Sequence, residues 1–144
     1  MNKNENMSEI TQLVNAAKQA FSKAYAPYSN FNVGSAAITT TGKIVQGCNV
    51  ENASYGLTVC AERNCIAQGV IQHNESAALQ FSTLVVYTEQ EKLTPPCGAC
   101  RQVIVEFLSA DAKVMAVNHK NDQKIWTVAQ LLPDAFTPSD LLDT

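Results

Sequence analysis

Two short cysteine segments constrain this chain more than any other feature of its sequence. The first pairs Cys60 with Glu62, and the second is the Cys-x-x-Cys pair Cys97 and Cys100, which follows a β-branched apolar stretch at residues 83–87. Both segments stand at the expected start of a helix, where unpaired N–H groups and the helix dipole favour thiolates. If the two helix starts point to one place, three thiolates converge there. Such a set is typical of a zinc site that keeps its fourth position open for water.

Each of these residues also has a simpler interpretation. The Cys97/Cys100 pair alone fits a thioredoxin-like redox pair, which also lies between a strand and a helix. Alone, Cys60 reads as a buried small residue and Glu62 as a solvated helix residue. A redox pair requires neither a third cysteine nor a nearby carboxylate, so the combination favours a catalytic metal site. A structural zinc module normally adds a fourth protein ligand, and no other Cys or His stands at a convincing spacing.

The remaining sequence predicts a single α/β domain. Strands alternate with helices from residue 60 onward, which suggests βαβ units and a partly parallel sheet, preceded by a hairpin at Thr41-Gly42. We expect a polar, flexible tail over residues 1–7 and one domain over residues 8–144. The expected helices cover 8–25, 60–73, 97–109 and a short segment after Thr127; the expected strands cover 31–39, 43–50, 83–87, 113–117 and 124–126.

Charge and hydropathy narrow the possible partners. The formal net charge is -3, which does not favour wrapping a nucleic-acid polymer, so a small molecule is the expected partner. No apolar run approaches the roughly 20 residues that a membrane helix needs, so no membrane partner is expected. The N-terminal residues contain no apolar signal core, which favours the cytoplasm, where thiols stay reduced.

Several ordered segments carry a resemblance to a known family. They are Tyr25–Ser29, Phe31–Gly34, Gly47–Ala53, Cys60–Arg63, Pro96–Gln102 and Leu131–Pro133. On these segments the chain resembles the small zinc-dependent cytidine deaminases that act on free nucleosides. The resemblance implies an α/β/α sandwich with a five-stranded mixed sheet, one Zn²⁺ per chain and a homotetramer with shared active sites. It also implies hydrolysis of cytidine and deoxycytidine to uridine and deoxyuridine with release of ammonia. A blasticidin-type deaminase shares the zinc motifs and stays the alternative.

The resemblance also implies roles for individual residues. Glu62 would carry the proton between water, the pyrimidine and the departing amine, while zinc acidifies the water. Arg63 would donate hydrogen bonds to zinc-bound sulfurs. Asn49 and Glu51 stand two apart at the end of an expected strand, so they point to one face. By resemblance, this pair would bind the 3′-hydroxyl of ribose.

Further positions would shape the substrate pocket. Phe31 resembles the aromatic residue that packs on the pyrimidine ring, and Ala61 would offer its backbone N–H to the base. Ala53, Tyr55 and Phe136 resemble positions that reach the site of a neighbouring subunit.

Overall fold

A five-stranded mixed sheet forms the centre of the protein. The computed structural model describes residues 3–142, with side chains from residue 9 onward. The strands are β1 (Gly34–Thr39), β2 (Ile44–Cys48), β3 (Phe81–Thr88), β4 (Leu108–Asn118) and β5 (Gln123–Thr127), in the spatial order β2-β1-β3-β4-β5. Only β3 and β4 pair in parallel; the other neighbours are antiparallel. The prediction of an α/β fold with a five-stranded mixed sheet is confirmed.

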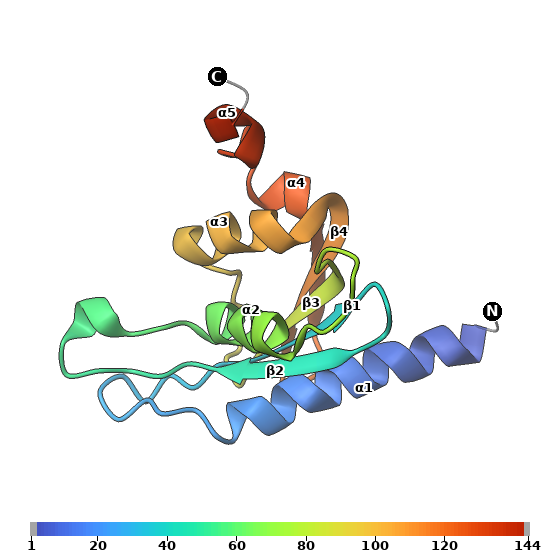
Figure 1. Ribbon diagram of the computed structural model, residues 1–144. Coiled ribbons are helices and arrows are strands. Elements are labelled where there is room, and N and C mark those ends of the chain that lie inside the picture. The colour runs from blue at the N-terminus through green and yellow to red at the C-terminus, as the bar shows by residue number, and fades with distance from the viewer. Residues whose placement is uncertain (1–2, 143–144) are drawn as a thin grey trace.

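Helices cover both faces of this sheet (Figure 1). One face packs against α1 (Lys3–Phe21), and the other packs against α2 (Ala61–Gln72) and α3 (Gly98–Phe107). β3 supplies alternate side chains to the two layers: Leu84 and Val86 lie in the core under α2 and α3, whereas Val85 and Tyr87 lie under α1. This strand is buried on both sides, which explains its continuous apolar sequence.

Two glycines let the helices approach the sheet closely. A Cβ atom at Gly34 would lie 2.0 Å from the carbonyl oxygen of Ala17 in α1. A Cβ atom at Gly47 would lie 2.2 Å from the backbone nitrogen of Cys65 in α2. Both obstacles are backbone atoms that no side-chain rotation can remove. The approach at Gly47 holds α2, and therefore its N-terminus, against β2.

The first helix differs from its expected range. It begins at Lys3 rather than Ser8, so the tail expected over residues 1–7 is helical from Lys3 onward, and residues 1–2 lie outside the described residues. No Gly or Pro interrupts this stretch, so the helix extends at little cost. The helix ends at Phe21 instead of residue 25. Tyr25 instead donates its N–H to the carbonyl of Asn49 at 3.0 Å, which draws the chain away from the helix.

The C-terminal part contains short helices. Thr127 caps α4 (Val128–Leu131) as expected, through a capping box with Gln130. The short helices η1 (Tyr55–Leu57) and α5 (Pro138–Leu142) were not expected, because neither is long enough to show periodicity. Among residues 3–142, no helix is both long and apolar enough to cross a membrane.

Candidate metal centre and substrate pocket

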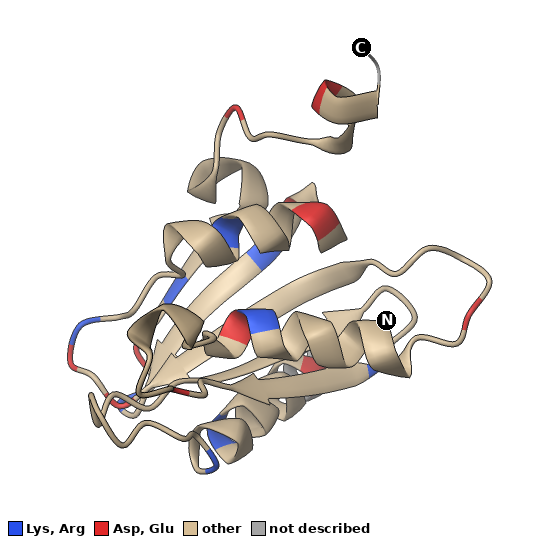
Figure 2. Cartoon of the chain, turned by 60° about the vertical axis from the view of Figure 1, so that its left-hand side comes forward, with Lys and Arg blue, Asp and Glu red and all other residues tan. Residues whose placement is uncertain are grey.

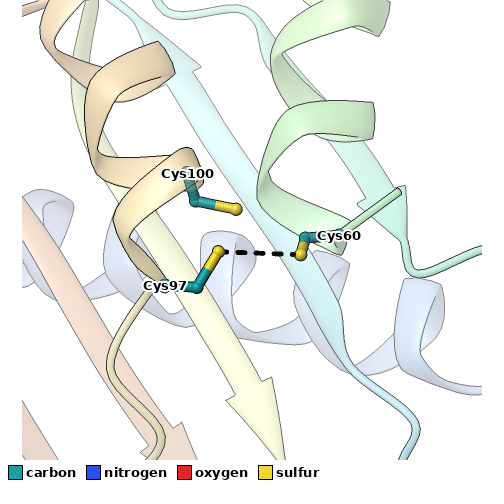
Figure 3. Close-up of side chains that lie close together, drawn as sticks. All are labelled: Cys60, Cys97 and Cys100. Atoms are coloured by element: carbon teal, nitrogen blue, oxygen red, sulfur yellow. Dashed lines mark hydrogen bonds between the residues drawn. The ribbon is translucent and has the colours of Figure 1, made fainter. Parts of the chain in front are cut away.

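Three cysteine thiols meet at the starts of α2 and α3. Cys60 is the N-cap of α2 and Cys97 is the N-cap of α3, and neither side chain caps its own helix. Cys100 lies in the first turn of α3 and points to the same place (Figure 3). The three Sγ atoms lie within 4.8 Å of one another, and those of Cys60 and Cys97 are 3.9 Å apart. Tetrahedral zinc with bonds of about 2.3 Å requires sulfurs about 3.8 Å apart, so the donor set fits zinc.

The loop before Cys97 is anchored by Arg101. The Arg101 Nε atom donates to the carbonyl of Pro96 at 2.8 Å, and Nη1 donates to the carbonyl of Leu131 at 2.8 Å. Leu131 is the last residue of α4, so no N–H within the helix donates to its carbonyl. The Arg101 guanidinium supplies this missing hydrogen bond. Arg101 therefore holds the metal loop against the C-terminal segment.

The surroundings of the thiols favour a thiolate at Cys60. The hydrogen bond with Cys100 is the main cause that lowers the pKa of Cys60 to about 5, and Arg63 acts in the same direction. The same hydrogen bond raises the pKa of Cys100, because Cys100 then holds the shared proton. Arg63 Nη2 lies 3.3 Å from the Cys60 sulfur, and its Nε atom is buried without a hydrogen-bond partner. A cationic group therefore faces the sulfurs, where it offsets their negative charge.

Glu62 is a buried carboxyl group beside these thiols. It is the second residue of α2, and only 5% of its surface is exposed. Burial is the main cause that raises the pKa of Glu62 above its ordinary value. A carboxyl group in such surroundings takes up and releases protons closer to neutral pH, as an acid–base group requires.

A cavity of about 230 Å³ opens beside Glu62 and the cysteines. The expected site residues that line this cavity are Phe31, Asn49, Glu51, Cys60, Ala61, Glu62 and Cys97. Ser29, Val33, Thr58, Val86, Thr94 and Pro95 complete the lining. The volume and the mixture of apolar and polar walls suit a small molecule.

Asn49 and Glu51 also hold the wall of this cavity. The Asn49 amide accepts from the N–H of Val33 at 2.9 Å and donates to the carbonyl of Phe31 at 2.8 Å. Glu51 Oε1 accepts from the N–H groups of Tyr28 and Ser29, at 3.0 and 3.1 Å. Each side chain keeps hydrogen-bonding capacity for a ligand, because an amide has four positions and a carboxylate about four.

Three of the residues expected to contact the substrate lie outside the cavity. Ala53 is exposed, Tyr55 is 74% exposed and Phe136 is 60% exposed. Tyr55 lines a neighbouring hollow of about 350 Å³ that shares Glu51 with the cavity. Phe136 lies in the C-terminal segment, where its carbonyl accepts from the Gln102 amide at 2.9 Å. Within one chain, these three side chains do not line the cavity.

Comparison with known proteins assigns this arrangement to a family. Residues 7–118 match the family model described as the cytidine and deoxycytidylate deaminase zinc-binding region. The chain is 42% identical to a cytidine deaminase of Halalkalibacterium halodurans over 131 residues, which cover 91% of this chain and 96% of that protein. The chain belongs to the cytidine deaminase family. The family's zinc-binding region includes Cys60, Cys97 and Cys100, whose thiols form the centre described above.

Two further relatives extend the comparison. A cytidine deaminase of Sporosarcina psychrophila is 41% identical over 133 residues, which cover 92% of this chain and 95% of that protein. The crystal structure of a Burkholderia pseudomallei cytidine deaminase superposes with a TM-score of 0.80 at 44% identity, and the match covers 88% of this chain and 98% of that chain. These matches show that the family's fold extends over most of the chain.

Sequence reasoning missed several residues that line the cavity. Thr94 and Pro95 precede the metal loop, so their proximity to Cys97 in sequence was an available signal. Ser29 and Thr58 lie in loops without periodicity, and only the folded chain brings them to the cavity.

Proposed function

We propose that this chain hydrolyses the exocyclic amine of cytidine and deoxycytidine, using one Zn²⁺ per chain. The observation that carries the proposal is a buried carboxyl group, Glu62, that lies beside three convergent thiols and opens on a cavity of small-molecule size. The curated relatives at 42% and 41% identity bear the name cytidine deaminase, which supports this substrate class.

The roles of the residues follow from their positions. Bound zinc would supply an acidified water as the nucleophile. The water oxygen would bond to C4 of the pyrimidine, while Glu62 takes one proton from the water and gives it to N3. Glu62 would then take the remaining hydroxyl proton and give it to the amine, which leaves as ammonia when the C4–N bond breaks, so the carboxylate alternates between base and acid. With Zn²⁺ bound by three thiolates, the site would carry a formal charge of about -1, which would weaken the metal as a Lewis acid. Arg63 offsets this charge through its contact with the Cys60 sulfur.

Zinc analysis combined with an absorbance assay tests this function. The purified protein should contain about one zinc per chain. It should also convert cytidine and deoxycytidine to their uracil counterparts, with loss of cytidine absorbance and release of ammonia. Full deaminase activity in metal-free protein, or no activity on either nucleoside in the zinc-loaded protein, would refute the proposal. Activity on blasticidin without activity on cytidine would favour the alternative.

Phe31 and Ala61 are proposed to hold the base. Both line the cavity next to Glu62, and Phe31 is 37% exposed, so part of its surface is available for contact with a base. Ala61 is the first residue of α2, and its backbone N–H is one of the helix N-terminal donors without an intrahelical acceptor.

Asn49 and Glu51 are proposed to bind the 3′-hydroxyl of the sugar. Changing either to alanine should lower kcat/KM for cytidine more than for 3′-deoxycytidine. The expected difference is on the order of 1–3 kcal/mol for each lost buried hydrogen bond. The decrease in kcat/KM that both substrates share reports damage to the loop. The additional decrease for cytidine reports the lost contact with the 3′-hydroxyl. Equal losses for the two substrates would show that the pair only supports the loop.

The chain is proposed to form a homotetramer with shared active sites. Large apolar side chains lie exposed near the cavity and on α2, including Tyr55, Leu57 and Ile71. Exposed apolar residues of this kind mark protein interfaces when they form contiguous patches. Ala53, Tyr55 and Phe136 would then reach the cavity of a neighbouring chain instead of their own.

Complementation between two variants tests sharing. Phe136→Ala and Glu62→Ala should each be impaired alone, whereas mixed oligomers should regain activity. If chains mix at random, roughly a quarter of the sites combine an intact Glu62 with an intact Phe136. The control mixes Glu62→Ala with Glu62→Gln chains, which cannot rebuild an intact site. A verified mixed oligomer without recovery would place Phe136 outside the shared site.

The proposed setting is the cytoplasm, with a free nucleoside as substrate. Zinc binding requires three reduced thiols, which the cytoplasm maintains. Basic and acidic positions are interspersed over the ribbon rather than separated, which does not favour a polynucleotide substrate (Figure 2).

A further inference from the structure

The loop that carries Phe31 into the cavity is held by a chain of side-chain hydrogen bonds. Residues 22–33 and 49–59 extend side by side beyond the sheet (Figure 1). Tyr25 and Val50 form a bridge between the two segments, and Glu51 donates its N–H to the carbonyl of Tyr25 at 2.8 Å. The N–H of Asn49 also donates to the carbonyl of Val33 at 3.3 Å, so backbone pairing aligns the segments on both sides of Phe31 but does not include Phe31 itself.

At Phe31, side chains replace the backbone pairing. The Ser29 hydroxyl donates to Glu51 Oε2 and accepts from the N–H of Phe31 at 3.0 Å. A serine hydroxyl has one donor and two acceptor positions, so it can serve both partners at once. Asn30, between them, adopts the left-handed conformation with φ +56°, which turns the chain back toward Ser29.

Hydrogen bonds therefore connect both polar backbone groups of Phe31 to Asn49 and Glu51, the pair proposed to bind the sugar. The Phe31 N–H reaches Glu51 through the Ser29 hydroxyl, and the Phe31 carbonyl accepts from the Asn49 amide. The Glu51 carboxylate accepts three hydrogen bonds from Tyr28 and Ser29, which leaves about one position for a ligand. The same hydrogen bond from the Ser29 hydroxyl is the main cause that lowers the pKa of Glu51.

We propose that Ser29 is a positioning residue that links the Glu51 carboxylate to the backbone of Phe31. The sugar hydroxyl and the pyrimidine ring are then recognised by one connected unit. A substrate that orders Glu51 also orders the aromatic wall against its base. This proposal rests on the proposed nucleoside substrate, but the link itself exists in the chain without substrate.

The Ser29→Ala variant removes the hydroxyl and keeps the backbone N–H that donates to Glu51. We expect KM for cytidine to rise about tenfold, as for the loss of one to two hydrogen bonds, while kcat and zinc content stay within about twofold. Ser29→Thr retains a hydroxyl and should restore KM to within about twofold of the unmodified protein. The control is Ser109→Ala, because Ser109 is an exposed serine at the start of β4, outside the cavity, whose hydroxyl donates to Asp111.

A double-mutant cycle separates positioning from direct contact. In a Phe31→Ala background no ring remains to be placed, so Ser29→Ala should raise KM further by less than about twofold. If the two changes multiply independently, Ser29 does not act through Phe31 and the proposal is wrong. An unchanged KM in Ser29→Ala, with the unmodified protein active, would likewise overturn it.

Amide exchange at Phe31 tests the link without any substrate. The N–H of Phe31 should exchange at least about fivefold faster in Ser29→Ala and at an unchanged rate in Ser29→Thr. This result is independent of activity, so an inactive protein would refute the proposed function without deciding the role of Ser29. Unchanged exchange in Ser29→Ala would show that the hydroxyl does not hold Phe31.

Discussion

Replacing Cys97 or Cys100 with alanine should remove the bound zinc and, with it, the deamination of cytidine. Each variant leaves two of the three thiols that lie within 4.8 Å of one another. Loss of a partner that only supports a ligand costs about 10–100-fold in metal affinity or activity, so loss of a ligand should exceed 100-fold. The measurements are zinc per chain in the purified protein and the rate of absorbance loss with cytidine.

Cys48→Ala provides the matched control for this experiment. Cys48 is half-buried, and its thiol donates to the carbonyl of Lys23 at 3.6 Å, away from the three convergent sulfurs. This variant should keep one zinc per chain and near-normal turnover. If Cys97→Ala and Cys100→Ala retained full zinc and full activity, the metal centre described here would be wrong.

Glu62→Gln should lower kcat by at least about 100-fold while the protein keeps its zinc. Glutamine has nearly the same shape as glutamate, but its amide cannot take up and release the proton. Burial of Glu62 raises its pKa because a charged carboxylate is costly away from water. The glutamine variant carries no charge there and should therefore fold normally. Turnover, zinc content and thermal unfolding of the same preparation check the three parts of this expectation.

Glu106→Gln makes the same chemical change at an exposed position of α3 and should leave kcat unchanged. Turnover of Glu62→Gln within a few-fold of the unmodified protein would exclude Glu62 as the proton carrier. Loss of zinc in Glu62→Gln would instead show that this carboxyl group supports the metal site.

The sequence predicted the elements of the fold better than their limits. Apolar stretches and glycine punctuation located all five strands, and the apolar runs within β1 and β3 reflect the burial of these strands on both faces. The first strand was expected from residue 31 but begins at Gly34. Residues 31–33 resemble a strand in sequence, yet both polar backbone groups of Phe31 and the N–H of Val33 bond to the side chains of Ser29 and Asn49.

The sequence by itself determined the chemistry of the metal centre. Cys60, Glu62, Cys97 and Cys100 stand at two helix starts, and the properties of a helix start are local ones that spacing along the chain reveals. Only the tertiary structure decided that the two helix starts converge and that α2 can approach β2 at Gly47. The same holds for the link from Glu51 through Ser29 to Phe31, since Ser29 and Glu51 lie 22 residues apart. Contacts of that range depend on how the sheet brings loops together, and no periodicity in the sequence records them.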